Sequence, residues 1–464
     1  MAGADDAAGR DGMSGEADAA GRDGTSGEAD ATRPTGSGAA SSSRGLTRRR
    51  LLLGGGGVVG LAAAAAAGYA VGDAQADEGD GGASGSGSSA IVPFEGTHQA
   101  GIATPAQARL VFGSFDVVSD SADDLRELLR AWTEAARLMT AGRPTGAVAG
   151  QPELPPQDTG EALGLGPSSL TITIGVAPSL FERDGEDRFG LRARRPAALK
   201  PLGPLPGDQL DPARSGGDLC VQACADDPQV AFHAVRNLLR AGRGIAELRW
   251  LQLGFGSNTA TTSGQQTPRN LMGFKDGTNN LKVDDGAALD RHVWVGDEEP
   301  QAWFRGGTYL VARRIRMLIE SWDRDRLSDQ EAVVGRRKVS GAPLGGRAEH
   351  DRPDLSARGA DGLPTIPVDA HIRLAAPATN DGAALLRRGY AYTDGIDPRT
   401  GLLDAGLFFV AFQRDPERQF VAIQRRLGAN DALTEYVQHT GSGLFAVPPG
   451  VRGRGGFVGE GLFG

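Results

Sequence analysis

After residue 91, apolar residues recur at every second position in some segments and at spacings of three and four in others. These two patterns predict an alternation of strands and helices. In the first half, alternation predicts strands at 108–118, 169–177, 218–225 and 249–255, and spacings of three and four predict helices at 121–139 and 227–239. Ser121 and Asp227 are placed to cap these helices, and Pro228 suits the first turn of the second. The order strand, helix, strand, strand, helix, strand is that of a ferredoxin-like unit.

The second half repeats this theme more loosely. It contains predicted strands at 307–318, 371–377 and 406–413, and predicted helices at 326–337 and 416–427. We therefore expect an α+β fold of two ferredoxin-like domains with antiparallel sheets, one at 91–280 and one at 281–464. Their junction falls at LMGFKDGTNN (271–280), and ligand sites are often found where two domains meet.

The first 46 residues have the composition of a disordered leader. Residues 7–18 recur as 19–30 with the single change of Met13 to Thr25, and neither copy contains a branched aliphatic or aromatic residue. Such a repeat cannot bury enough apolar area to fold. A linker rich in Gly and Ser occupies 77–90.

Residues 47–76 between leader and linker resemble a twin-arginine signal peptide. Arg48 and Arg49 precede a charge-free run at 51–72, and a small-x-small step at 74–76 follows. The run is long enough to span a bilayer, so a transmembrane helix is the alternative, although Gly and Ala make it only weakly apolar. We expect export by the twin-arginine route to the cell envelope or outside, without a stable membrane span after cleavage.

Cysteine usage and charge exclude some classes of site and partner. The two cysteines, Cys220 and Cys224, lie on one predicted strand about 13 Å apart at the usual rise per residue, too far for a disulfide. A structural role for both is the simpler interpretation. The net charge of −9 argues against a nucleic-acid partner.

Three residues stand out as candidates for chemistry. His371 lies at the entry of a predicted strand, whereas His233 falls on the polar side of its helix and is expected at the surface. Arg387 precedes a second arginine and a glycine, and Asp276 lies in a turn between Gly273 and Gly277. Structural readings remain open, because a lone histidine is often structural and an Asp-Gly step often serves only as a turn.

The sequence contains no nucleophile elbow, Walker loop, dinucleotide fingerprint or multi-cysteine zinc pattern. An imidazole, an arginine and an aspartate are the parts that a haem peroxidase needs. The imidazole holds the iron. The aspartate moves a proton between the oxygens of peroxide, and the arginine steadies the departing hydroxide.

Several segments resemble the dye-decolourising peroxidases, especially their secreted, iron-uptake-associated, deferrochelatase-like subgroup. GFKDG matches the Gly-x-x-Asp-Gly motif of the family, HIRLAAP (371–377) resembles its proximal-histidine stretch, and LLRRGYAY (385–392) resembles its distal-arginine stretch. Further similar segments are found at 94–102, 305–317, 340–346 and 406–415, so the resemblance covers roughly 90 to 450 in the family's order. It implies a fold of the dimeric α+β barrel type and a haem b cofactor bound in the second domain.

The resemblance also implies residue roles. His371 would be the proximal iron ligand, Asp276 the distal acid and base, and Arg387 the distal cation. Leu407 and Phe409 would line the distal pocket. The second ring nitrogen of a metal-bound histidine usually has an acceptor, and Asp431 and Glu435 are the candidates for it here.

The implied activity is a peroxidase that uses hydrogen peroxide to oxidise dyes, phenolic compounds or other bulky donors. A haem-binding protein of iron uptake, of the deferrochelatase type, is the alternative, since both would hold haem with the same residues. The resemblance leaves open a homo-oligomer.

Overall fold

Nine strands form a single antiparallel sheet in this computed structural model, which describes residues 90–257 and 259–464. The predicted leader and signal peptide, and all but the last residue of the predicted linker, lie outside the described residues. The strands are β1 Arg109–Val117, β2 Thr171–Val176, β3 Leu219–Ala225, β4 Ala246–Ser257, β5 Thr308–Met317, β6 Leu386–Arg387, β7 Tyr390–Ile396, β8 Leu403–Gln413 and β9 Val437–Val447.

The sheet closes on itself. Its order is β5-β9-β2-β3-β1-β4-β7-β8-β6, and β8 also pairs with β5, so that eight strands complete a ring and the short β6 is added beside β8. Within each half the strands follow the ferredoxin-like order: β4-β1-β3-β2 in the first and β9-β5-β8-β7 in the second. The halves join through pairing of β4 with β7 and of β2 with β9. The predicted α+β fold with antiparallel sheets is therefore confirmed.

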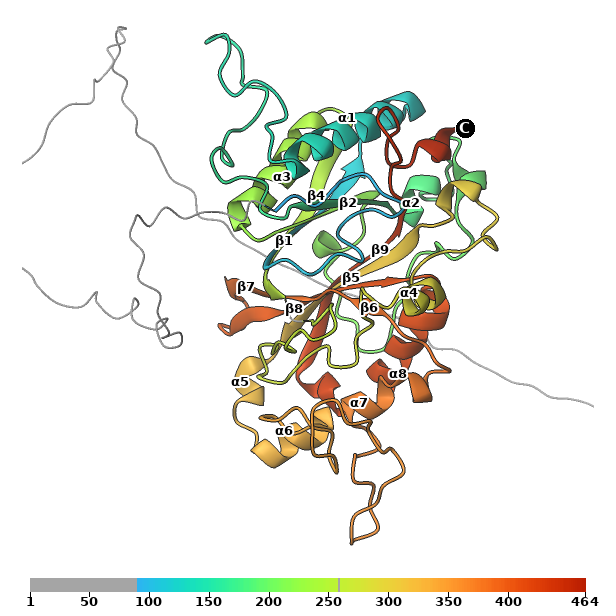
Figure 1. Cartoon of the computed structure of the whole chain (residues 1–464). Helices are drawn as coiled ribbons and strands as arrows, with labels where there is room; N and C mark the ends of the chain where they lie inside the picture. The colour runs from blue at the N-terminus through green and yellow to red at the C-terminus, as the bar shows by residue number, and fades with distance from the viewer. Residues whose placement is uncertain (1–89, 258) are drawn as a thin grey trace, which may run out of the picture. The chain divides into compact units, whose positions relative to one another are not determined.

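Helices cover the two halves on opposite sides of the sheet (Figure 1). They are α1 Ala122–Thr140, α2 Pro178–Phe181, α3 Pro228–Ala241, α4 Gly286–His292, α5 Ile319–Trp322, α6 Leu327–Val334, α7 His371–Leu374 and α8 Ala422–Asn430. Ser121 and Asp227 cap α1 and α3 through their side chains, as predicted. A π-helical turn, Glu417–Val421, leads into α8.

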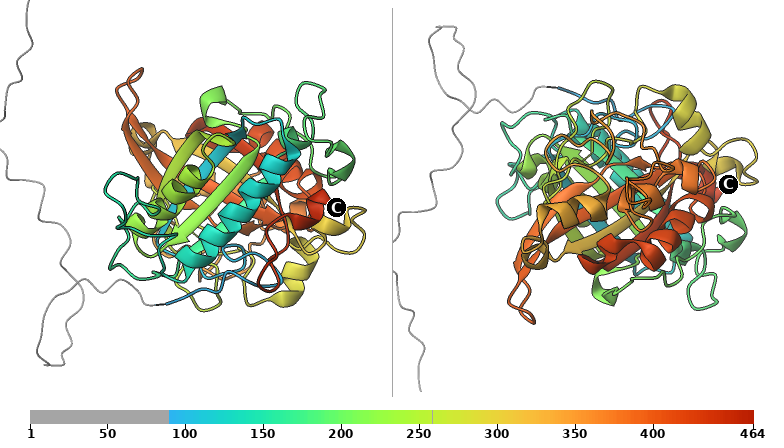
Figure 2. Two further views of the ribbon diagram at one scale, coloured as in Figure 1. Left: turned by 90° about the horizontal axis from the view of Figure 1, so that it is seen from above. Right: turned by 90° about the horizontal axis from the view of Figure 1, so that it is seen from below.

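Three apolar cores follow from this layering. The first lies between α1, α3 and the strands of the first half, where Trp132 packs edge-on against Phe115; Figure 2 shows these two helices over the sheet. The second joins the facing surfaces of the two halves and includes Phe112 and Phe408. The third lies between β8 and the loops of the second half, and it supports the predicted site.

The prediction of a strand at 371–377 is wrong, because residues 371–374 form the short helix α7. The residues of this segment form no ladder with any strand of the sheet, and the Ala375 amide donates to the His371 carbonyl as in a helical turn. Pro377 limits the helix to about one turn, and the preceding Ala376 is extended, with φ −66° and ψ 141°. His371 is therefore presented from the first position of a helix rather than from a sheet.

The prediction that His233 lies at the surface is also wrong. Its side chain is buried, and its Nε2 lies 3.0 Å from Oδ1 of the buried Asp158. Asp158 belongs to the long connection between α1 and β2, which folds over the polar side of α3. Burial raises the pKa of the Asp158 carboxyl, but hydrogen bonds from His233 and two backbone amides outweigh burial and lower the pKa to about 2.

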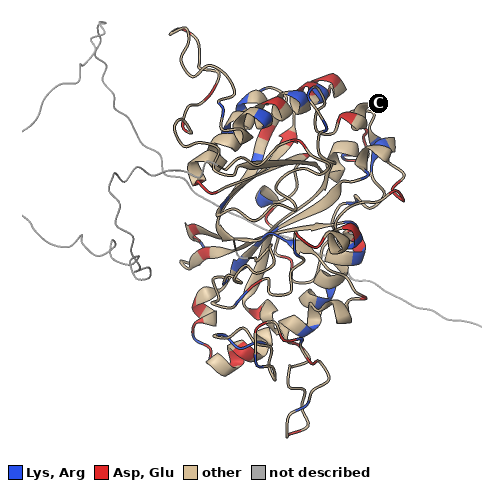
Figure 3. Cartoon of the chain, viewed as in Figure 1, with Lys and Arg blue, Asp and Glu red and all other residues tan. Residues whose placement is uncertain are grey.

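The buried arginines of β5 are paired with carboxylates. Blue Lys and Arg positions occur within the strands near the centre of the ribbon as well as on the outer helices (Figure 3). Three arginines of β5 each form an ion pair with an aspartate of another segment. The pairs are Arg313 with Asp208, Arg314 with Asp394, and Arg316 with Asp397. Both cysteines are buried and free, as predicted, and burial raises the pKa of the Cys220 thiol. In the described part of the chain, no helix is long and apolar enough to cross a membrane.

Candidate active site

The structure brings His371 to Asp431, one of its two predicted partners. His371 Nδ1 lies 2.6 Å from Asp431 Oδ2, whereas Glu435 is exposed. Asp431 is itself fixed, because its other oxygen accepts a hydrogen bond of 2.9 Å from the Leu433 amide. Burial lowers the pKa of the His371 imidazole, but the charge and hydrogen bond of Asp431 outweigh burial and raise it. With Nδ1 committed to the carboxylate, Nε2 is the ring nitrogen left to bind a metal.

The turn that contains Asp276 depends on two glycines. Gly273 and Gly277 have φ of +84° and +87°, a region that other residues rarely adopt. A side chain at Gly277 would also collide with the backbone of Thr259, 3.1 Å from the added Cβ. The Asp276 amide donates to the Pro268 carbonyl over 2.9 Å, so the turn is closed by its own backbone. As predicted, the glycines give the turn its shape.

Asp276 and Arg387 meet in the folded chain although 111 residues separate them. Arg387 Nη1 donates to Asp276 Oδ1 over 2.9 Å. Both groups also influence the pKa of His371, the charge of Asp276 raising it and that of Arg387 lowering it. All three predicted residues therefore lie within electrostatic reach of one another.

These side chains retain access to solvent. The exposed fractions are 33% for His371, 27% for Arg387 and 14% for Asp276. A ligand can therefore reach each of them.

Leu407 and Phe409 lie on one face of β8, opposite Ile315 and Arg313 of β5. Leu407 belongs to the third core with Met272 of the Asp276 turn, and Phe409 packs against the same core. Phe409 also lies near Phe420, with ring centroids 6.1 Å apart. The predicted pocket residues thus line the sheet beneath the Asp276 turn.

Sequence reasoning missed Asn280, the last residue of LMGFKDGTNN. Its Oδ1 accepts from the Arg387 amide over 2.8 Å, and its Nδ2 donates to the Arg387 carbonyl over 3.0 Å. The motif therefore supplies Asp276 and also holds the backbone of the arginine that pairs with it. An amide four residues after the aspartate was the available signal, but nothing in the sequence pointed to its partner.

The residues present fit a haem. Among the described residues no group of three His, Cys, Asp or Glu side chains could hold a bare metal ion. One histidine with a free nitrogen suits an iron whose other equatorial ligands come from a macrocycle. An acid and a cation lie near this histidine, and apolar side chains lie beneath them.

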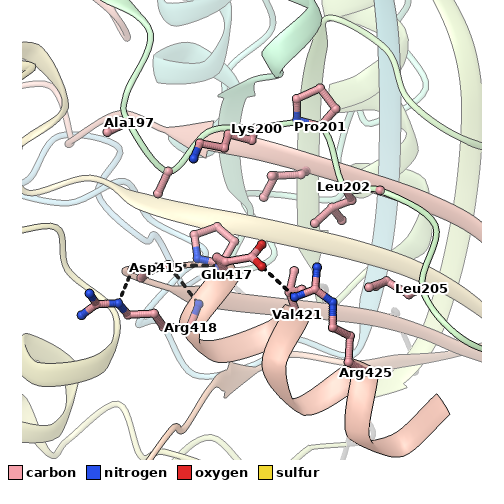
Figure 4. A pocket seen from close by; sticks show the side chains of 14 residues that line it. Ala197, Lys200, Pro201, Leu202, Leu205, Asp415, Glu417, Arg418, Val421 and Arg425 are labelled. Carbon is pink, nitrogen blue, oxygen red and sulfur yellow. Dashed lines mark hydrogen bonds and ion pairs between the residues drawn. The ribbon is translucent and has the colours of Figure 1, made fainter. Parts of the chain in front are cut away.

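A surface pocket elsewhere contains none of these residues (Figure 4). It lies between the loop 197–205 and residues 415–425. Two of its arginines are paired with acids of the same pocket, Arg418 with Asp415 and Arg425 with Glu417. No histidine lines it, so it lacks a residue that could bind haem iron.

Comparisons with known proteins match both halves of the chain. Two family models match, the N-terminal domain of Dyp-type peroxidases over residues 99–256 and the C-terminal domain over 267–452. The chain is 40% identical to a deferrochelatase of Escherichia coli (strain K12) over 375 residues, which make up 80% of this chain and 86% of that protein.

Solved structures show the same relationship. Ferric DtpA from Streptomyces lividans is 44% identical, with a TM-score of 0.73, over 81% of this chain and 98% of that one. A DyP-type peroxidase from Streptomyces coelicolor is 43% identical, with the same TM-score and the same coverage. The chain therefore belongs to the Dyp-type peroxidase family and is a haem peroxidase.

Proposed function

We propose that this peroxidase uses hydrogen peroxide to oxidise dyes, phenolic compounds or other bulky donors, with Asp276 and Arg387 as its catalytic residues. The observation that carries the proposal is the 2.9 Å contact between Asp276 and Arg387, close enough to His371 to affect its pKa. An acid and a fixed cation side by side are what cleavage of an oxygen-oxygen bond requires.

Each residue has a distinct task in this proposal. His371 Nε2 would hold the iron of haem b, and Asp431 keeps the imidazole oriented through Nδ1. Haem, when bound, would supply the redox chemistry of the reaction. Asp276 takes the proton from the near oxygen of peroxide and delivers it to the far one, and Arg387 stabilises the negative charge that develops there. Leu407 and Phe409 keep water out.

The overall reaction balances with two donors. One peroxide accepts two electrons and two protons and becomes two waters. Each of two phenolic donors gives up one electron and one proton, and leaves as a radical.

The alternative is release of iron from haem, of the deferrochelatase type, which the name of the Escherichia coli relative favours. One experiment distinguishes iron release from peroxidase activity. The purified haem-loaded protein is incubated with an anthraquinone dye, with and without peroxide, while dye absorbance and porphyrin fluorescence are recorded. We expect dye loss only with peroxide and no metal-free porphyrin. Porphyrin accumulation without dye loss would instead support the alternative.

We also propose export by the twin-arginine route to the cell envelope or beyond. Support comes from Arg48, Arg49 and the weakly apolar run after them, which lie outside the described residues. Changing both arginines to lysine should retain the folded, haem-loaded protein in the cytoplasm, as measured by cell fractionation. Unchanged export of this double variant would contradict the proposal.

A further inference from the structure

Glu349, in the loop that follows α6, contacts the Asp276 turn on both sides of the aspartate. Its carboxylate forms an ion pair with Lys275, which precedes Asp276, and accepts from Thr278 Oγ1 over 3.1 Å, two residues after it. Thr267, before the turn, donates to the same carboxylate. One side chain thus connects three points of the segment that presents the predicted acid.

The carboxylate is held in its ionised form. Burial raises the pKa of Glu349, but hydrogen bonds from Lys275, Thr267 and Thr278 and the charge of Lys275 outweigh burial and lower the pKa to about 2. The side chain is 13% exposed, so bulk solvent screens these interactions little. The carboxylate therefore stays ionised until the pH falls to about 2.

The backbone of Glu349 is anchored as well. Arg336 Nη1 donates to the Glu349 carbonyl over 2.9 Å and to the Gly341 carbonyl over 2.7 Å. Arg336 is 7% exposed. Glu349 is therefore fixed at both its main chain and its side chain, as an anchor for a neighbouring turn must be.

The turn has backbone hydrogen bonds of its own, among them that of the Asp276 amide to the Pro268 carbonyl, but glycines on both sides of the aspartate make it easy to displace. Gly273 and Gly277 flank the aspartate, and glycine gains more conformational freedom than other residues when a contact is lost. Without Glu349, the direct contacts to the Asp276 carboxylate are those of Arg387 at 2.9 Å and Asn270 at 3.5 Å. These two contacts hold the carboxylate itself, whereas Glu349 holds the side chains of Lys275 and Thr278 on either side of it.

We infer that Glu349 is a positioning residue of the peroxide reaction, which holds the turn so that Asp276 faces Arg387 and the reacting oxygens. This inference rests on the proposed role of Asp276. The Glu349 carboxylate contacts Lys275, Thr267 and Thr278, and its effect on Asp276 is transmitted through Lys275 and Thr278.

The test measures the second-order rate constant of the absorbance change when haem-loaded protein is mixed with peroxide in a stopped-flow instrument. Glu349→Ala should slow this reaction about 10- to 100-fold, the size expected when a catalytic group is displaced by about 1 Å. Glu349→Gln retains an oxygen that can accept from Thr278 but loses the charge that pairs with Lys275. Its rate constant should lie between those of Glu349→Ala and the parent. Haem content and the resting absorption spectrum should match the parent in both variants.

A double variant separates positioning from general damage. In an Asp276→Asn background, adding Glu349→Ala should change the rate less than about twofold, because the group on which Glu349 acts is already disabled. The matched control is Glu161→Ala. Glu161 pairs with Arg236 at 3.2 Å and is 16% exposed, but it lies in the first half, and its loss should leave the peroxide reaction unchanged.

The outcomes distinguish the inference from the proposed function. A parent-like rate in Glu349→Ala, with a slow Asp276→Asn, would overturn the positioning role alone. The positioning role would also be overturned if Glu349→Ala lowered the rate constant as much in the Asp276→Asn background as in the parent. An equally large fall in the rate constant of Glu161→Ala would overturn it as well, because both results would indicate a general loss of stability. A parent-like rate in Asp276→Asn would overturn the proposed function and this inference with it.

Discussion

Replacing His371 with alanine is expected to give a folded protein that has lost most of its haem. The side chain is the predicted iron ligand, and Asp431 orients it from 2.6 Å. Loss of such an orienting partner typically costs about 10- to 100-fold in metal affinity. Asp431→Ala should therefore weaken haem binding by that factor, and His371→Ala by more. Haem titration followed at the Soret band measures both, and circular dichroism checks the fold.

Two other histidines serve as controls because the structure gives them different tasks. His98 stacks on Trp294 with ring centroids 3.6 Å apart. His439 is buried between Arg313 and Gln424, and burial together with the charge of Arg313 lowers its pKa to about 3. Alanine at either position should leave haem binding intact. The assignment fails if His371→Ala keeps the parent spectrum while His98→Ala or His439→Ala loses it.

The second large effect is expected at the distal pair. Asp276→Ala should slow the reaction with peroxide about 10²- to 10⁴-fold, the usual contribution of a general acid or base. Arg387→Ala should slow it about 10²- to 10³-fold, the usual cost of removing a preorganised charge. Both variants should still bind haem, because His371 and Asp431 are unchanged. Stopped-flow absorbance on mixing with peroxide gives the rates.

A surface ion pair provides the matched control for these substitutions. Arg414 pairs with Glu298, whose side chain is 65% exposed. Exposed pairs contribute little, so Arg414→Ala and Glu298→Ala should react with peroxide like the parent. Parent-like rates in both Asp276→Ala and Arg387→Ala would remove this pair from the mechanism.

Where burial alone decided the pattern, the sequence predicted the strands and helices of the first half and the strands β5 and β8 of the second, although it missed the long strand β9. β8 is an example. Leu407 and Phe409 are two residues apart and therefore lie on the same face of the strand, and pairing with β5 and β7 on both sides fixes that face. Helix starts were equally predictable, since the signal at Ser121 is a local hydrogen bond. These features depend on a few neighbouring residues.

Features that depend on distant partners could not be predicted. Residues 371–374 alternate like a strand, but only the fold shows that they pair with no strand and form a helical turn instead. His233 looked exposed because a helical pattern does not reveal a loop that folds over it and supplies Asp158. The anchors Asn280 and Glu349 act on partners 107 and 71 residues away, at Arg387 and Thr278.

The central claim is that haem lies between His371 and the pair formed by Asp276 and Arg387. A crystal structure of the haem-loaded protein tests it most directly. The account predicts that the iron is bound by Nε2 of His371, that Nδ1 remains on Asp431, and that Asp276 and Arg387 face the opposite side of the macrocycle. An iron bound by another residue, or a macrocycle with Asp276 and Arg387 on the same side as His371, would contradict it.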